Sequence, residues 1–113
     1  MNQMIRSFET LYPTLNCPGV YLVEDTHACF FGGHFADRED KRTFLHHAHA
    51  LSARLHEWTG RAENFGRLGR PPATRAGGAP VSEFCRTTNS VCFYDSVVVF
   101  ERRHRPEPWH EVR

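Results

Sequence analysis

Histidine is the residue type with the clearest capacity for chemistry, because eight of the 113 residues are histidines. Three of them, His46, His49 and His56, lie in one stretch at spacings that bring side chains of neighbouring helical turns together. Imidazoles placed in this way could share a metal ion. The stretch contains no His-Glu-x-x-His motif, and Glu57 is the nearest carboxylate on that face. We therefore favour a solvated polar helix face, predict no cofactor, and keep a metal site at these three histidines as the alternative.

Arginine is concentrated in residues 60–80, which also contain five glycines and three prolines. Four arginines and one glutamate give this segment a net charge of +3. A loop of this length is uncommon in a compact domain unless it is functional or disordered. Arginine pairs with carboxylate or phosphate at two points, and arginine and tryptophan are enriched at binding hot spots. We therefore predict a flexible loop and a C-terminal region that bind a partner through Arg61, Arg67, Arg70, Arg75, Arg102, Arg103, Arg105 and Trp109.

Part of this loop, Arg67-Leu68-Gly69-Arg70-Pro71-Pro72, resembles the Arg-Gly-Arg-Pro hooks that insert arginines into the minor groove of DNA. Leu68 interrupts the core of that motif. Four arginines could contact about four phosphates, which predicts weak and salt-dependent contact with nucleic acid. The main partner that we expect is a protein or a nucleoprotein complex.

A third group of residues comprises Gly19-Val20-Tyr21, then Phe30-Phe31-Gly32, then Arg42 and His46. This group resembles the core of the GIY-YIG nuclease family. The resemblance implies two paired strands and a helix, with Tyr21 and Arg42 framing the scissile phosphate, His46 beside them, and a downstream glutamate holding a divalent metal. Phe30 stands where the family has its second tyrosine, and no helix predicted here carries the glutamate. A metal-dependent nuclease built on Tyr21, Arg42 and His46 is therefore the alternative function.

The four cysteines, Cys17, Cys29, Cys85 and Cys92, are dispersed, with no Cys-x-x-Cys pair. The N-terminus lacks the apolar core and cleavage site of a secretory signal. We therefore predict four reduced thiols that pack as small apolar side chains in a cytoplasmic protein. No apolar run is long enough to cross a bilayer, so we expect no membrane partner.

One amphipathic helix, predicted for residues 40–59, positions the histidines. Its apolar residues recur at steps of three and four, which is the period of a helix with one buried stripe. Asp37 or Asp40 could cap its start, and Gly60 could end it. The predicted buried stripe consists of Phe44, Ala48, Leu51, Leu55 and Trp58.

The other elements complete a small α+β domain. Residues 2–12 have helical spacing and are closed by Pro13. Residues 19–24 and 27–35 predict a first β-hairpin, and residues 83–88 and 91–102 predict a second, with its turn at residues 89–90. This order predicts one domain over residues 1–113: an antiparallel sheet of two hairpins, a short N-terminal helix, one central amphipathic helix, and an extended tail at residues 104–113.

The function predicted from the sequence follows mainly from what its motifs exclude. The net charge of +1 argues against an acidic mimic of DNA and against a strongly basic coat. No phosphate-binding loop and no Gly-x-Ser-x-Gly nucleophile motif is present. We therefore predict a small non-enzymatic binding or inhibitory module. Its general character is that of phage- or mobile-element-encoded inhibitors of nucleic-acid-targeting defence complexes, as anti-CRISPR proteins are. The sequence leaves the oligomeric state open.

Overall fold

The computed structural model describes residues 2–30, 43–61, 64, 67–71, 74–75 and 81–108. These residues contain both helices and strands, which confirms the predicted α+β class. In chain order the elements are α1 (Asn2–Leu11), the 3-10 helix η1 (Tyr12–Thr14), β1 (Gly19–Val23), η2 (Thr26–Phe30), α2 (Phe44–Ala53), η4 (Arg54–His56), α3 (Glu57–Gly60), α5 (Glu83–Thr87), β2 (Thr88–Tyr94) and β3 (Val97–Arg102).

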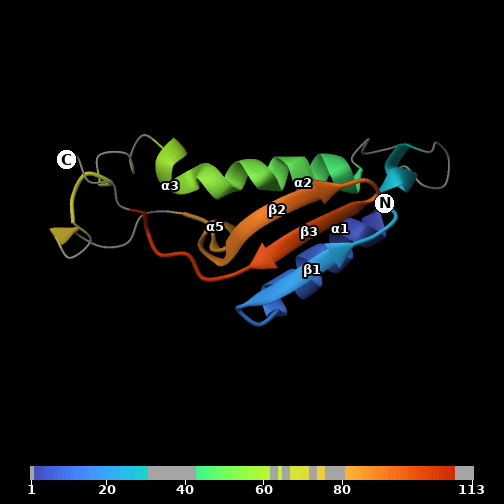
Figure 1. Cartoon of the computed structure of the whole chain (residues 1–113), viewed down its shortest axis with the longest axis horizontal. Helices are drawn as coiled ribbons and strands as arrows, with labels where there is room; N and C mark the ends of the chain where they lie inside the picture. The colour runs from blue at the N-terminus through green and yellow to red at the C-terminus, as the bar shows by residue number, and fades with distance from the viewer. Residues whose placement is uncertain are drawn as a thin grey trace.

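In the part of the chain that the structure describes, the sheet has three antiparallel strands in the order β1-β3-β2, so β3 is central. Figure 1 shows α1 behind β1 and β3, while α2 runs alongside β2. The predicted antiparallel sheet with helices on one face is therefore confirmed, with three strands in place of two separate hairpins.

The first predicted hairpin is wrong in its described part, because residues 27–30 lie in the 3-10 helix η2 and β1 pairs with β3. Asp25 takes a left-handed backbone conformation with φ of 58°, which turns the chain out of the strand direction. The next residues form η2, and the buried Thr26 donates its N–H to the carbonyl of Ser96 at 3.1 Å. Residues 31–35 of the predicted strand lie outside the described residues.

The second hairpin forms with its turn in a different place. Ser82 caps α5 by accepting a hydrogen bond from the backbone N–H of Cys85, so residues 83–87 are helical and not a strand. The chain reverses at Asp95-Ser96, where Ser96 has φ of 65°. The predicted turn at residues 89–90 is instead an irregularity in the pairing of β2 with β3.

The core lies between the sheet and the two long helices. The apolar stripe predicted for the central helix is confirmed, since Phe44, Ala48, Leu51 and Trp58 are buried and Leu55 is half-buried. Thr43 caps this helix, with its side chain accepting from the N–H of His46, and α3 ends at Gly60 as predicted. The main cluster of buried side chains is Ile5, Phe8, Tyr12, Val23, Phe44, Ala48, Leu51, Val98 and Phe100.

All four cysteines are free thiols, as predicted; Cys85 is buried and the other three are half-buried. Cys29 lies in η2 and not in the strand that the sequence predicted. Among the helices in the described ranges, none has both the length and the apolar character needed to cross a membrane.

Candidate functional site

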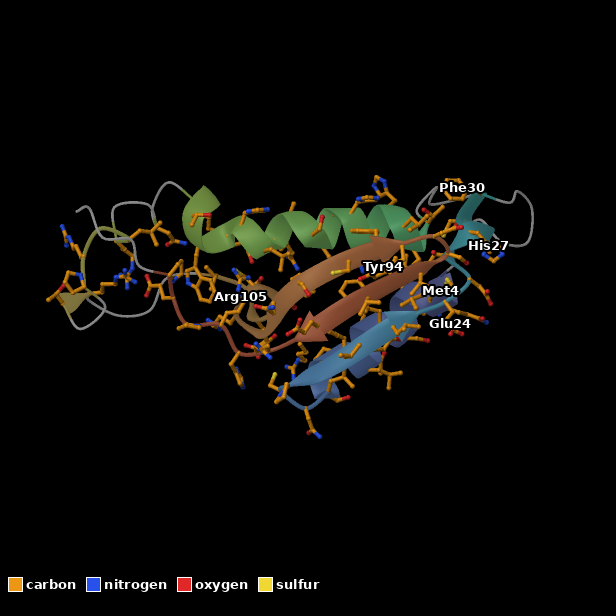
Figure 2. The ribbon with its side chains drawn as sticks, in the orientation of Figure 1. Met4, Glu24, His27, Phe30, Tyr94 and Arg105 are labelled. Carbon is orange, nitrogen blue, oxygen red and sulfur yellow. The ribbon has the colours of Figure 1, made fainter. Side chains whose placement is uncertain are left out.

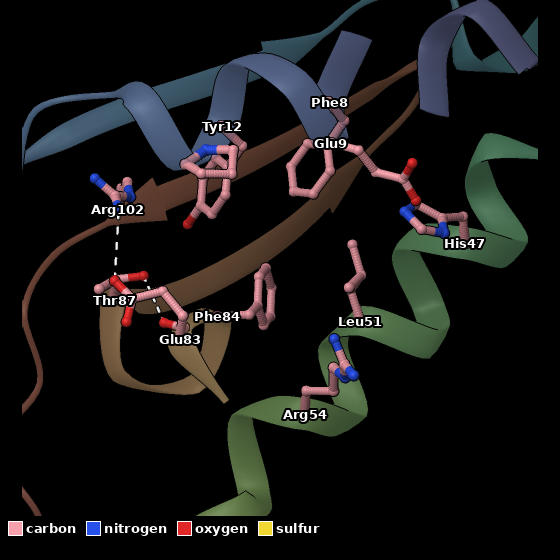
Figure 3. Close-up of a pocket in the computed structure, with 11 residues that line it drawn as sticks. Phe8, Glu9, Tyr12, His47, Leu51, Arg54, Glu83, Phe84, Thr87 and Arg102 are labelled. Carbon is pink, nitrogen blue, oxygen red and sulfur yellow. Dashed lines mark hydrogen bonds and ion pairs between the residues drawn. The ribbon is translucent and has the colours of Figure 1, made fainter. Parts of the chain in front are cut away.

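A cavity of about 240 Å³ lies on the helical side of the sheet, where α1, η1, α2 and α5 meet (Figure 3). Aromatic and aliphatic side chains form most of its wall, and charged side chains come from several elements around them. Its lining residues are Phe8, Glu9, Tyr12, Pro13, His47, Leu51, Arg54, Glu83, Phe84, Thr87 and Arg102.

Local helical spacing places the apolar wall. Phe8 and Tyr12 are four residues apart, so they lie on one side of the chain as α1 runs into η1, and their rings stack at 4.7 Å between centroids. Leu51 belongs to the buried stripe of α2. Ser82 is the N-cap of α5, so this helix begins at Glu83 and Phe84 lies in its first turn. The ring of Phe84 lines the cavity and lies 5.8 Å from that of Tyr12. Three helices therefore supply one continuous apolar surface.

Tyr12 carries a buried hydroxyl at this wall, 2.6 Å from the hydroxyl of Thr88. Burial, the largest influence, raises the pKa of Tyr12 above its ordinary value, although the Thr88 hydrogen bond and the charge of Arg102 act in the opposite direction. Tyr12 is therefore neutral at physiological pH and acts as a fixed polar group in the wall.

Arg102 supplies a positive charge to the same wall, and its position is fixed by the protein. It is nearly buried, donates from Nη1 to the carbonyl of Leu15, and lies with its guanidinium 5.8 Å from the centre of the Tyr12 ring. Its Nη2 is 4.0 Å from a carboxylate oxygen of Glu83. Its buried Nε has no hydrogen-bond partner within the described part of the chain. Such a group is held in place by packing and keeps unused hydrogen-bonding capacity.

The charges that line the cavity are balanced. Two carboxylates, from Glu9 and Glu83, accompany two guanidinium groups, from Arg54 and Arg102. Figure 3 shows Glu9 beside His47 at one end and Glu83 with Arg102 at the other. A cavity with an apolar wall and balanced charges suits a neutral ligand whose hydroxyl or carbonyl groups can both donate and accept hydrogen bonds.

The predicted partner-binding arginines lie mostly in contacts within the chain. Arg61 pairs with Glu57 at 2.6 Å, and Arg103 with Glu101 at 3.4 Å. Arg70 is exposed, while Trp109 lies outside the described residues. The role of these residues in partner binding stays a prediction.

Glu107 of the C-terminal region pairs with two arginines of the arginine-rich segment, Arg67 and Arg75. Its carboxylate lies 3.0 Å from Nε of Arg67 and 3.2 Å from Nη1 of Arg75. The hydrogen bond from Arg67, followed by the charges of both arginines, outweighs partial burial and lowers the pKa of Glu107. Leu68 in the same segment is buried, so these described residues pack against the protein.

Arg105 has a structural role in the described contacts. Its Nη1 donates to the carbonyls of Leu55, Cys85 and Thr88 at 3.1–3.3 Å, and its guanidinium lies 5.3 Å from the centre of the Trp58 ring. The side chain thereby satisfies carbonyls where helical segments end, which is the place where they lack helical partners.

The histidines of the central helix are not gathered around one point. His46 and His56 are exposed, and His49 stacks on Phe93 of β2 with ring centroids 4.3 Å apart. No group of three or more metal-ligating side chains occurs among the residues that the structure describes.

The described residues of the nuclease-like group, Tyr21, Phe30 and His46, do not lie on the two paired strands and helix that the resemblance implies in that order. Tyr21 is half-buried and packs edge-on against Phe8 at 5.3 Å, and burial raises the pKa of its hydroxyl. Phe30 lies in η2, so the second strand that the resemblance implies does not begin there. His46 is exposed on α2, and Arg42 is outside the described residues. The nuclease alternative is therefore not supported.

Comparisons with known proteins found a match in structure alone. No protein family and no curated protein matches the sequence. Among solved structures, the chain is similar to the MycE methyltransferase from the mycinamycin biosynthetic pathway. It matches two crystal forms in complex with Mg and SAH, and a third structure that also contains mycinamycin VI. The TM-scores are 0.59, 0.60 and 0.60, with 18% sequence identity.

The match covers 97% of this chain but only about a quarter of the MycE chain. At this identity the likeness shows a shared fold. It contradicts the predicted function of a non-enzymatic inhibitor, because the similar structures are methyltransferases. None of these comparisons supports a phage-encoded or anti-CRISPR-like protein.

Proposed function

We propose that this chain takes part in methyl transfer, as a domain that binds the methyl-accepting substrate. The observation that carries the proposal is a fold shared over 97% of the chain with methyltransferase structures, one of which holds mycinamycin VI beside SAH. SAH is what remains of the donor S-adenosylmethionine after its methyl group has left. Two tasks are therefore available for a domain of this fold: binding the donor or binding the acceptor.

The topology of the described sheet argues against donor binding. Nucleotide-containing cofactors are commonly bound at the carboxyl ends of parallel strands, where a glycine-rich turn leads into a helix. Both strand pairings among the described residues are antiparallel. We therefore propose that a separate protein unit binds the methyl donor. On this proposal, that unit is the protein partner expected from the sequence. The predicted cytoplasmic location remains part of the proposal.

The cavity favours acceptor binding. Its apolar wall of Phe8, Leu51 and Phe84 fits a hydrocarbon ring or chain, and its balanced charges fit a neutral molecule with hydroxyl groups. A volume of about 240 Å³ lies just below the range of about 300–1,000 Å³ that is usual for drug-sized ligands. We therefore expect the cavity to take one part of a larger acceptor, whose remainder extends over the surface.

A binding experiment with the isolated chain tests this assignment. Amide chemical shifts are recorded while three probes are added separately: mycinamycin VI as a neutral hydroxylated compound, a fatty acid as an apolar anion, and SAH. We expect the neutral compound to shift the resonances of Phe8, Leu51 and Phe84, and SAH to shift none of them.

The variant Phe84→Ala should abolish these shifts, because it removes one wall of the cavity. Tyr94→Ala is the matched control, since Tyr94 is exposed on the other side of the sheet. Binding of SAH with no response to the neutral compound would assign the donor to this chain and overturn the proposal.

A further inference from the structure

Arg102 lines the cavity with only part of its hydrogen-bonding capacity in use. Its side chain is 10% exposed. Nη1 donates to the carbonyl of Leu15, and the buried Nε has no hydrogen-bond partner among the described residues. The polar contact of Nη2 there is with a carboxylate oxygen of Glu83 at 4.0 Å, which is too long for a hydrogen bond. Nη2 is therefore the atom of Arg102 that remains for a ligand.

A second arginine shows how fully this chain can use a guanidinium group. Figure 2 shows Arg105 beside α5. Its Nη1 donates to three backbone carbonyls, and its Nη2 donates to the carbonyl of Leu55 at 3.3 Å. Both Nη atoms of Arg105 are engaged within the protein. Arg102 differs, because only one of its Nη atoms donates within the described part of the chain.

The hydroxyl groups near Arg102 are already engaged. The hydroxyl of Thr87 donates to the carbonyl of Glu83 at 2.7 Å. The hydroxyl of Tyr12 lies 2.6 Å from that of Thr88, so these two groups are hydrogen-bonded to each other. A ligand oxygen at this end of the cavity would therefore receive its hydrogen bond from Arg102.

The apolar part of the cavity fits a hydrocarbon ring. Figure 3 shows the side chains of Phe8, Leu51 and Phe84 directed toward one space, with Arg102 and Glu83 at one end of it. An engineered apolar cavity of about 150 Å³ is large enough to bind benzene. The volume of about 240 Å³ found here therefore holds one six-membered ring and a substituent.

We propose that Arg102 determines which ligands the cavity accepts, by donating from Nη2 to a carbonyl or hydroxyl oxygen on a hydrocarbon ring. The ring lies against Phe8, Leu51 and Phe84, and the oxygen points toward Arg102. This inference rests on the proposed function, in which the cavity holds part of the methyl acceptor. It adds the chemical group that the cavity recognises and the direction in which that group points.

The charge beside Arg102 favours a neutral oxygen over a carboxylate. Glu83 already places a negative charge near the guanidinium. A ligand carboxylate would bring a second negative charge to the same place, and it would lose its hydration on entering a mainly apolar cavity. A carbonyl or hydroxyl oxygen accepts the same hydrogen bond without adding charge, and the positive charge of Arg102 strengthens that bond.

Three ring compounds of similar size test the role of Arg102 in the full chain. Cyclohexanone carries a carbonyl oxygen, methylenecyclohexane has the same shape without that oxygen, and cyclohexanecarboxylate carries a negative charge. Amide chemical shifts of Phe8, Leu51 and Phe84 give the three dissociation constants. We expect cyclohexanone to bind at these residues, and cyclohexanecarboxylate to bind more weakly.

Substitution of Arg102 isolates the hydrogen bond. In Arg102→Leu the preference for cyclohexanone over methylenecyclohexane, taken as the ratio of their dissociation constants, should fall about tenfold through loss of a hydrogen bond from a charged group. The ratio cancels a general change in the cavity, because the two compounds have the same shape. Arg103→Leu is the matched control and should keep the ratio of the parent. Arg103 is 61% exposed, pairs with Glu101 and does not line the cavity.

The Nε resonance of Arg102 gives a second readout, which holds even if Arg102→Leu fails to fold. It should move when cyclohexanone is added and stay in place with methylenecyclohexane. An unchanged ratio, an unmoved Nε resonance or tighter binding of cyclohexanecarboxylate would each overturn the role of Arg102, yet leave a cavity that binds an apolar ring. If no ring compound binds, the role of Arg102 is also wrong, and the response to mycinamycin VI decides the proposed function separately.

Discussion

The two faces of the sheet differ although they are built from the same strands. On the helical face, Val98 and Phe100 of β3 are fully buried under α1 and α2. On the open face, the alternate residues Val97 and Val99 of β3 are half-buried, and Leu22 of β1 is half exposed. The covered face contains the core and the cavity, whereas the open face contains neither.

This difference shows what determines burial here. The sequence of β3, Val-Val-Val-Phe-Glu-Arg, is apolar at four consecutive positions, so its own pattern does not choose a face. The packing of the helices determines which face of the sheet is buried, because the apolar stripe of each helix is buried against one face of the sheet. Substitutions on the two faces should therefore differ strongly in effect.

The largest expected effect is that of Phe100→Ala on the covered face. Phe100 is completely buried and lies 4.4 Å from Phe8 between ring centroids. Removing a buried phenylalanine side chain costs about 3–5 kcal/mol of unfolding free energy through lost burial and a cavity. Urea denaturation measures this loss. A loss below about 1 kcal/mol would show that the helical face is not the core.

The next effect is the loss of a polar link that holds the covering helices together. Glu57 of α3 accepts hydrogen bonds from the side chain and backbone N–H of Ser82, the residue that caps α5. A hydrogen bond to a charged group contributes about 1.5–3 kcal/mol. We therefore expect Glu57→Gln to cost about that much at neutral pH, with Glu101→Gln on the open face as the control.

The same link predicts how stability depends on pH. Burial by itself raises the pKa of Glu57, but hydrogen bonds from Ser82 and the charge of Arg61 outweigh it, so the pKa lies below the ordinary 4.5. A lowered pKa in the folded state gives stability above the unfolded pKa, and this stability is lost as the pH falls through the folded value. The gap in melting temperature between the parent and Glu57→Gln should therefore narrow from pH 7 to pH 3.

The sequence predicts a helix well when its apolar residues repeat at helical spacing. It predicts a helix less well when the main signal is a single N-cap residue. The stripe of the central helix is visible because five apolar residues repeat at helical spacing. α5 was missed because Phe84, Cys85 and Thr87 suit a strand equally well, and only the Ser82-Glu83 pair indicates a helix start. The hairpin turn was misplaced because Asn89-Ser90 and Asp95-Ser96 have similar turn propensity.

The candidate site could not be predicted, because its wall is made by packing. Phe8, Leu51 and Phe84 come from three helices that are far apart in the sequence. The contacts of the arginines were also not predictable, because the sequence does not show which residues far along the chain they pair with. Arg67 pairs with Glu107 forty residues away, and Arg102 is buried in the cavity wall although we predicted it at a partner surface. Long-range pairing of this kind needs the fold.

The smallest expected effect, that of Val20→Thr, examines the open face most closely. Val20 is 60% exposed, and threonine keeps the branched shape that suits a strand. In dilute protein the unfolding free energy should therefore change by less than about 0.5 kcal/mol, as is usual at exposed positions. Urea denaturation of the dilute protein measures this change. A large loss in dilute protein would mean that the open face is covered within the monomer, and the contrast between the two faces would then disappear.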